Sequence, residues 1–201
     1  MGKEETVKGI IIDSGGIART AQFNHAGIHN YELTTMFNQG FLTRVRHGYY
    51  RLADQNDLSE EQMISVFFPE GIICMDSALF HYGYSDRTPL EWTIAVPRSV
   101  TASKLRMDLF PYRLYFVQSK YLNLGKTAAD FNGTTISVYD RERTICDCFR
   151  YRTKLDSEMF NKAIKAYVAD ERKNLSILSS YAKEMQLFRR INDLLGVLLN
   201  D

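Results

Sequence analysis

The chain has 201 residues, of which 45% are hydrophobic and 24% are charged, as in an ordinary globular protein. This length fits one medium domain or two small ones, with a core that needs no disulfide or metal. The 25 Lys and Arg residues and 24 Asp and Glu residues give a net charge of +1. This balance excludes a strongly basic coating protein and an acidic solvating tail.

Cysteine usage and the first residues predict a cytoplasmic protein. Cys74, Cys146 and Cys148 cannot all pair, and the last two are too close for a normal disulfide, so we expect a reducing compartment. The charged segment 1–9 differs from a signal peptide, and no run approaches the roughly 18 apolar residues of a membrane span. We therefore expect no membrane partner.

Charged residues are grouped in blocks along the chain. Segment 17–51 has four arginines and a single acid, whereas segment 54–92 has eight acids and a single arginine. The sign changes beside the polar run 53–56. We therefore predict two domains, one over residues 1–55 and one over residues 56–201.

The first domain reads as three helices followed by a hairpin. These elements are predicted from the spacing of apolar residues and from local end signals. Thr20 is an expected cap, and Gly15-Gly16 and Gly40 are expected helix ends. The expected helices cover residues 7–14, 20–25 and 30–39, and the expected strands cover 42–45 and 49–52. Arg46-His47-Gly48 forms the hairpin tip. This order is typical of a winged helix-turn-helix.

The third helix is predicted to contact the DNA bases. Leu33, Met36 and Phe37 are expected to face the core, so the opposite side presents amide and hydroxyl groups that can bond base edges in a major groove. His29, at the N-cap, would favour a phosphate, and the hairpin arginines would meet the adjacent backbone. Glu32 is an exception, because a helix that contacts DNA is usually basic and this residue is acidic. The predicted contacts with double-stranded DNA are Thr20, His29, Asn30, Tyr31, Thr34, Thr35, Asn38, Arg44, Arg46, His47 and Arg51.

The second part reads as strands followed by helices, an α+β layout. Ser59 with Gln62 forms a capping box for a helix through Phe67, and Asp76 is expected to cap a helix over 77–82. The expected strands cover 92–96, 113–117, 127–131 and 135–139, the last two joined by the hairpin signal Asn132-Gly133. Helical periodicity follows from Asp140. The predicted fold is thus a winged helix-turn-helix followed by a mixed α/β domain ending in a helical array.

Segment 98–126 contains six basic residues interleaved with aromatics. Such a pattern suits nucleic acid, and it also suits ordinary strand alternation with solvated charges facing the acidic segment 54–92. Both interpretations stay open from the sequence. The residues of this second basic surface would be Arg98, Lys104, Arg106, Arg113 and Lys120.

An enzyme is the alternative for the second domain. Asp140, Glu142 and Asp147 could serve a metal-dependent nuclease, but a helix N-cap and first turn account better for the first two. Gly125-Lys126-Thr127 lacks the earlier glycine of a phosphate-binding loop. Neither the histidines nor the cysteines make a convincing zinc set, so we expect no metal, no cofactor and no catalytic residue. A third alternative is a winged helix that binds protein instead of DNA.

The sequence also resembles a known family. The stretch GGIARTAQFNHAGIHNYELTTMFNQGFLTRVRHGYYRL is similar to the winged-helix domain of AbiEi-type antitoxins. The resemblance continues through SALFHYGYSDR, WTIAVPR, YFVQSKYLNLG and ISVYDRERTICDCFR. It implies a DNA-binding N-terminal domain, a C-terminal antitoxin domain, and an autorepressor of a type IV toxin–antitoxin system in phage defence. The implied functional partner is a nucleotidyltransferase-like toxin that is opposed without a stable complex.

Overall fold

The computed structural model describes residues 2–55 and 58–198, and within the described helices the side chains of Lys104, Leu195, Val197 and Leu198 are left out. Contacts divide the chain into unit 1, Met1–Pro69, and unit 2, Glu70–Asp201. The boundary expected from the charge pattern was residue 55. The contact grouping places the next helix, α4 (Glu60–Phe67), in unit 1.

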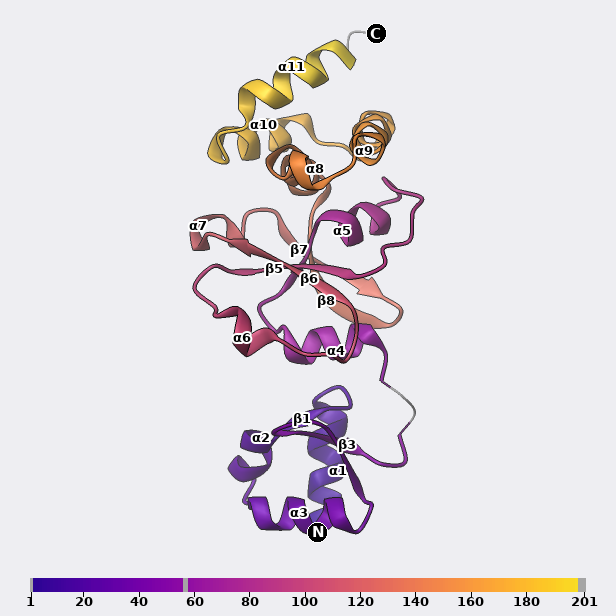
Figure 1. The fold of residues 1–201 in the computed structure, drawn as a ribbon, viewed down its shortest axis with the longest axis vertical. Coiled ribbons are helices and arrows are strands. Elements are labelled where there is room, and N and C mark those ends of the chain that lie inside the picture. Colours follow the sequence, from indigo (N-terminus) through magenta and orange to yellow (C-terminus); the bar gives the residue numbers. More distant parts are fainter. Residues whose placement is uncertain (1, 56–57, 199–201) are drawn as a thin grey trace. The chain divides into compact units, whose positions relative to one another are not determined.

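Unit 1 is a winged helix-turn-helix with a three-stranded sheet (Figure 1). Its helices are α1 (Lys3–Asp13), α2 (Thr20–His25) and α3 (Asn30–Asn38), and its hairpin strands are β2 (Leu42–Arg46) and β3 (Tyr49–Leu52). The sequence did not reveal β1 (Ala18–Arg19), which pairs antiparallel with β3. Gly40, with φ +76°, ends the turn after α3, as expected.

Apolar residues three and four positions apart form the core of unit 1. Val7 and Ile11 of α1 meet Phe23 of α2 and Leu33 of α3. The expectation that Phe37 belongs to this core was wrong, because its side chain is 38% exposed. The buried residues of α3 are Glu32, Leu33 and Met36.

Unit 2 is built on a five-stranded mixed sheet in the order β6-β5-β4-β8-β7. The strands are β4 (Ile72–Ile73), β5 (Trp92–Pro97), β6 (Tyr112–Val117), β7 (Lys126–Phe131) and β8 (Thr134–Tyr139). Asn132 and Gly133 both have positive φ, as the predicted tight hairpin between β7 and β8 requires. The two-residue β4 was not predicted, and it joins β5 to β8.

The helices of unit 2 follow the predicted periodicity from residue 140. They are α8 (Arg141–Arg150), α9 (Ser157–Ala169), α10 (Leu175–Glu184) and α11 (Phe188–Leu198), with the single turn η1 (Arg152–Lys154) before α9. The short helices are α5 (Met75–His81), α6 (Ala102–Leu105) and α7 (Ser119–Leu122). α8 is the centre of the helical layer, because residues 142–149 are all buried.

One predicted cap was wrong. Asp76 was expected to cap α5, but the helix begins at Met75, two residues before the expected start, and its N-cap is Cys74. Thr93 takes over the polar contacts of this helix start, since its hydroxyl donates to the carbonyl of Cys74 and accepts from the N–H of Ser77. The Ser59–Gln62 capping box of α4 is present as predicted.

Candidate nucleic-acid interface

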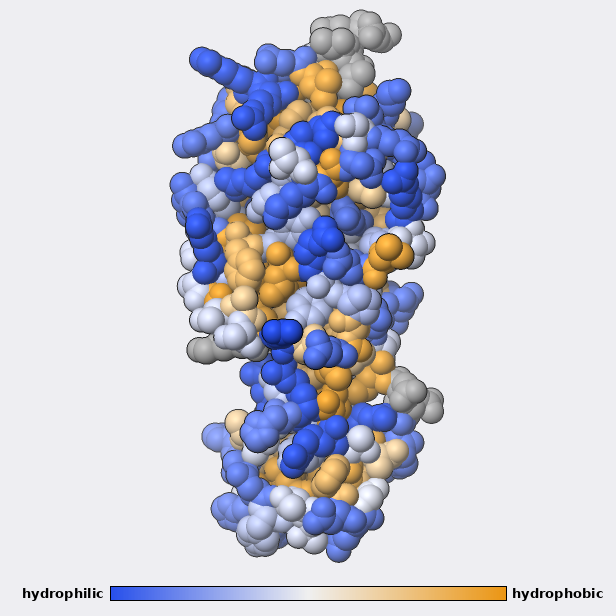
Figure 2. Space-filling view, viewed as in Figure 1, coloured by the Kyte–Doolittle hydropathy of each residue, from blue (hydrophilic) through white to orange (hydrophobic). Residues whose placement is uncertain are grey.

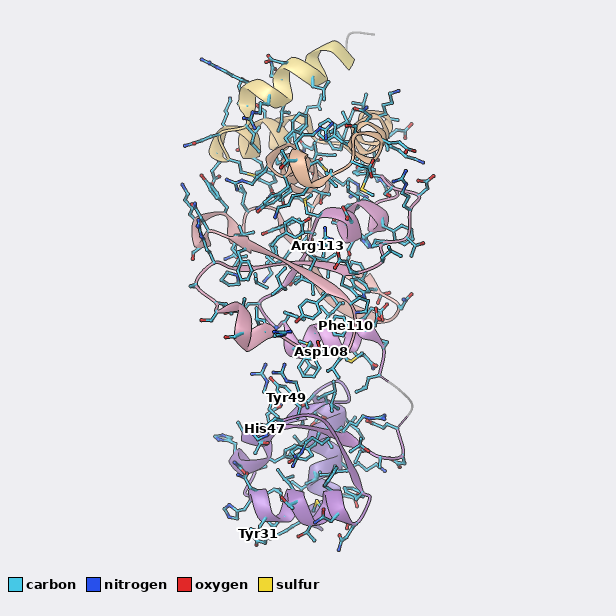
Figure 3. The ribbon with its side chains drawn as sticks, viewed as in Figure 1. Tyr31, His47, Tyr49, Asp108, Phe110 and Arg113 are labelled. Carbon is cyan, nitrogen blue, oxygen red and sulfur yellow. The ribbon has the colours of Figure 1, made fainter. Side chains whose placement is uncertain are left out.

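The exposed side of α3 carries the polar side chains that the sequence assigned to base reading. Leu33 and Met36 are buried against the core, and this fixes which side of the helix faces outward. Tyr31 is 67% exposed and projects from the end of unit 1 in Figure 3. We call the exposed residues of this side the helix surface: Asn30, Tyr31, Thr34, Thr35 and Asn38.

The two threonines of the helix surface have a defined hydrogen-bonding state. The hydroxyl of Thr34 donates to the carbonyl of Asn30 at 3.0 Å, and that of Thr35 donates to the carbonyl of Tyr31 at 2.9 Å. Each hydroxyl proton is therefore used inside the helix, and the oxygen keeps its capacity to accept. The helix surface can thus offer acceptors from threonine and both donors and acceptors from asparagine.

Glu32 does not oppose DNA binding in the way its charge suggested. It is buried, forms an ion pair with Lys3 of α1, and accepts a hydrogen bond from the backbone N–H of His29 at 2.8 Å. The hydrogen bond from Lys3 and that from the backbone of His29 lower the pKa of Glu32, so the carboxylate stays ionised. The only acid of α3 is therefore turned inward and caps the helix.

His29 is the N-cap residue of α3, as predicted. It is exposed, and its ring lies 6.2 Å from the ring of Tyr31 with nearly parallel planes. Peptide N–H groups and the helix dipole favour an anion at such an end.

The two hairpin arginines point to opposite faces of the small sheet. Arg44 pairs with Tyr50 and Arg46 pairs with Tyr49, with a bulge between them. Because neighbouring residues of β3 face opposite sides, their partners do so too. Arg44 lies beside α3, with Cζ 5.3 Å from the ring of Phe37, and it donates to the Tyr50 hydroxyl at 3.2 Å.

Arg46 lies in a second cluster around the hairpin tip. Its Cζ is 5.5 Å from the ring of Tyr49 and 5.5 Å from that of Phe67 in α4, while Arg19 Cζ is 5.3 Å from Tyr49. Thr20 starts α2 instead of capping it, and its backbone N–H and hydroxyl both donate to the carbonyl of Gly48. We call Arg19, Thr20, Arg46 and His47 the tip surface.

The predicted contacts therefore form two groups. Figure 3 places Tyr31 and His47 at opposite ends of the winged helix. The helix surface, His29 and Arg44 belong to one group, and the tip surface forms the other. The guanidinium of Arg51 donates to the carbonyl of Gln55.

Two participants were missed by sequence reasoning. Arg19 was counted as a charge but not assigned to the interface, because the strand β1 that positions it has only two residues. Lys3 was not noticed because its partner Glu32 is 29 residues away.

The structure describes the side chains of four of the five residues assigned to the second basic surface. Arg113 forms an ion pair with Glu91, which is the ordinary charge pairing left open from the sequence. Figure 3 labels Arg113 on the sheet and Asp108 with Phe110 in the loop before β6. Arg98, Arg106 and Lys120 are exposed, and Arg106 lines a cavity of about 680 Å³ with the 107–112 loop. The side chain of Lys104 lies outside the described residues.

The three carboxylates of the nuclease alternative each have a structural partner. Asp140 caps α8 by accepting from the N–H of Arg143, and Glu142 accepts from the N–H of Asn174. Asp147 is buried and pairs with Arg143, whose Nε lies 3.1 Å from its Oδ1. Burial raises the pKa of Asp140 and Asp147 against these favourable contacts. These roles favour the structural interpretation of all three.

The remaining candidate motifs have structural explanations. Gly125 has a φ of +72°, and a Cβ there would come within 2.5 Å of the Cβ of Arg143, so a glycine is needed for close packing. Cys74, Cys146 and Cys148 are free and buried. Among the described residues, no three His, Cys, Asp or Glu side chains are grouped as a metal site. No helix within 2–55 and 58–198 is long and apolar enough to cross a membrane.

Family comparison confirms the resemblance for the winged helix. Residues 9–53 match the family described as transcriptional regulator, AbiEi antitoxin. This segment includes α2, α3 and the hairpin, and thus both groups of predicted contacts. The class of protein that the match supports for this segment is a DNA-binding transcriptional regulator.

Structural comparison supports the fold over most of the chain. The chain resembles the crystal structure of the RV2827C protein from Mycobacterium tuberculosis with a TM-score of 0.56 and 14% sequence identity. The similarity covers 89% of this chain and 70% of that one. At this identity it establishes the fold alone. No curated protein matches the chain in sequence.

Proposed function

We propose that the protein is a cytoplasmic transcriptional autorepressor that acts as the antitoxin of a type IV toxin–antitoxin system in phage defence. Unit 1 binds a promoter or operator in double-stranded DNA, and unit 2 carries the antitoxin activity. The functional partner is a nucleotidyltransferase-like toxin, opposed without a stable complex. The match over residues 9–53 supports the DNA-binding regulator. Autorepression, the type IV antitoxin role and the toxin partner rest on the resemblance of the motifs in unit 2.

The observation that carries DNA binding is the helix surface. It presents five exposed polar side chains on a helix whose only acid is buried and paired. An α-helix fits the major groove of B-DNA, and asparagine can bond adenine edges in two places. A protein-binding winged helix would instead expose apolar side chains there, and of this set only Tyr31 offers a large ring.

The helix surface is proposed to read the sequence, while His29 and Arg44 contact phosphates beside it. Arg44 is exposed and held next to α3 by the rings of Phe37 and Tyr50, so its position relative to the helix is defined. The tip surface is proposed to make weaker phosphate contacts than Arg44, since Arg46 lies on the opposite face of the hairpin. Phosphate contacts give affinity for DNA of any sequence, and base contacts give preference for the operator sequence.

Asn30→Ala tests this function. Asn30 is exposed at the start of α3, and its side chain makes no hydrogen bond within the described residues, so its loss should not disturb the fold. We expect the variant to bind the operator more weakly by about 1–3 kcal/mol and a scrambled duplex almost as well as wild type. Titration of both duplexes at fixed salt measures the two affinities.

Asn161→Ala is the matched control, because Asn161 is an exposed asparagine on α9 of unit 2. It should bind both duplexes like wild type. If Asn30→Ala also keeps the wild-type ratio of operator to scrambled affinity, the helix surface does not read bases, and the protein-binding alternative gains support.

A further inference from the structure

The helix surface matches the major-groove edges of some bases and not of others. Figure 2 shows mostly blue to white colours along the lower edge of unit 1, where Figure 1 places α3, so this edge is polar. In the major groove adenine presents a donor beside an acceptor, and thymine an acceptor and a methyl group. Guanine presents two acceptors and cytosine a donor. Each base therefore calls for a different kind of side chain.

Asparagine is the side chain that matches adenine. Asn30 and Asn38 are both exposed, and neither amide makes a hydrogen bond with any part of the chain that the structure describes. An amide can donate to N7 and accept from the amino group of the same adenine. Positions eight apart lie on the same side of a helix, about 12 Å apart along its axis. Two adenines a few base pairs apart are thus within reach of one helix.

The two threonines match thymine through their methyl groups. A helical threonine adopts one of two rotamers, according to the bond that its hydroxyl makes with the preceding turn. The hydroxyl of Thr34 donates to the carbonyl of Asn30 at 3.0 Å. That of Thr35 donates to the carbonyl of Tyr31 at 2.9 Å. Each exposed methyl group is therefore held in one orientation, which suits contact with the 5-methyl group of thymine.

Guanine is poorly matched by α3. Its two acceptors are bonded best by arginine or lysine, and α3 contains neither. The threonine hydroxyls do not replace them, because their protons are donated within the helix. Arg44 lies beside α3 but belongs to β2, where it is held by the rings of Phe37 and Tyr50 and donates to the Tyr50 hydroxyl.

Cytosine is also poorly matched, because its amino group calls for an exposed carboxylate. The only acid of α3 is Glu32, whose Oε1 is paired with Lys3. Its Oε2 accepts from the backbone N–H of His29 at 2.8 Å. Both carboxylate oxygens are thus used inside the protein. The acceptors of the threonines serve the amino group of adenine as well as that of cytosine, so they give no preference for cytosine.

We propose that α3 reads A·T base pairs. Asn30 and Asn38 bond adenine, and the methyl groups of Thr34 and Thr35 contact the 5-methyl groups of thymine. This inference rests on the proposed function, because it names the bases that the helix surface recognises. It makes the methyl group of thymine, which forms no hydrogen bond, a determinant of the operator.

The test uses the full-length protein and a duplex that wild type enriches from a random library. The preferences that Asn30→Ala loses in the same selection mark base pairs contacted by α3, and we expect these to be A·T pairs. Deoxyuridine then replaces each thymine in and beside these pairs, which removes the methyl group and keeps the hydrogen-bonding groups. Wild type should bind about fourfold more weakly for each methyl group that it contacts.

Thr34→Ser/Thr35→Ser removes the methyl groups on the protein side and keeps the hydroxyls. It should bind the thymine duplex more weakly than wild type and lose nothing further with deoxyuridine, because interacting groups are not additive. Thr6→Ser on α1 is the matched control, since Thr6 also donates its hydroxyl to the carbonyl four residues earlier, that of Gly2. This control should respond to deoxyuridine as wild type does.

The inference would be overturned if wild type bound deoxyuridine and thymine duplexes equally, or if wild type and Thr34→Ser/Thr35→Ser lost the same affinity with deoxyuridine. A G·C pair among the preferences lost by Asn30→Ala would also overturn it. In each of these cases the enriched duplex would still support sequence-specific binding, and thus the proposed function. A library from which wild type enriches no sequence would instead contradict both.

Discussion

At the scale of single residues, the buried Arg143–Asp147 pair connects α8 to the segment that follows β6 in unit 2. Arg143 is fully buried, and it links α8 to the carbonyls of Tyr121 and Leu124 as well as to Asp147. The interaction runs between positions i and i+4 of α8. Asp147 offsets the cost of burying the guanidinium, and burial raises the pKa of the carboxyl.

Asp147→Ala is expected to lower the free energy of unfolding by about 3–5 kcal/mol, because it leaves a buried cation without its partner. Asp147→Asn keeps an oxygen that can accept from Arg143 Nε, so it should cost less than Asp147→Ala. Urea denaturation followed by circular dichroism measures both values. An Asp147→Ala variant within about 1 kcal/mol of wild type would show that solvent reaches Arg143 freely, contrary to the packing.

At the scale of elements, the hairpin of unit 1 divides its two arginines between different surroundings. Arg44 lies beside α3 over Phe37 and Tyr50, and Arg46 lies over Tyr49 and Phe67. The bulge between them produces this division, since without it both would lie on one face. The sequence alone suggested that both would meet the same stretch of DNA backbone.

Arg44→Ala should flatten the salt dependence of operator binding by about one unit of slope, because its charge lies next to the reading helix. Arg46→Ala should change the slope less, since Arg46 faces away from the helix surface. The two variants remove the same charge from neighbouring positions, so each controls for the other. Equal reductions of slope would mean that the DNA follows both faces of the hairpin, as the sequence pattern first suggested.

The elements also show what sequence reasoning can reach. Capping residues and turn glycines are local signals, so the start of α4, the end of α3 and the β7–β8 hairpin were predicted correctly. The strands β1 and β4 have two residues each and exist only through pairing with distant strands, which no local pattern encodes. Glu32 was misjudged for the same reason, because its partner Lys3 comes from α1.

At the scale of the whole molecule, the order of charges and the contacts agree on two units and differ on α4. The charge pattern places the boundary before Ser59, while the contacts group α4 with unit 1. Phe67 of α4 contacts Tyr49 and Arg46, with its ring centroid 4.8 Å from that of Tyr49. The division of function proposed above depends on unit 2 folding without the winged helix.

Limited proteolysis tests this division, and the sequence suggests the protease. Residues 52–86 contain no Lys or Arg, whereas Asp54, Asp57 and Glu60 lie around the expected boundary, so an acid-specific protease is suited and trypsin is not. We expect the first cut there, leaving a C-terminal fragment that resists further digestion, keeps its helical circular dichroism and no longer prefers the operator. One core cluster of unit 2 consists only of residues between Ile72 and Ile191, which is the physical reason for this expectation. A fragment digested as fast as it forms would show that α4 needs the winged helix to hold unit 2 together, and the separation of DNA binding from antitoxin activity would then fail with it.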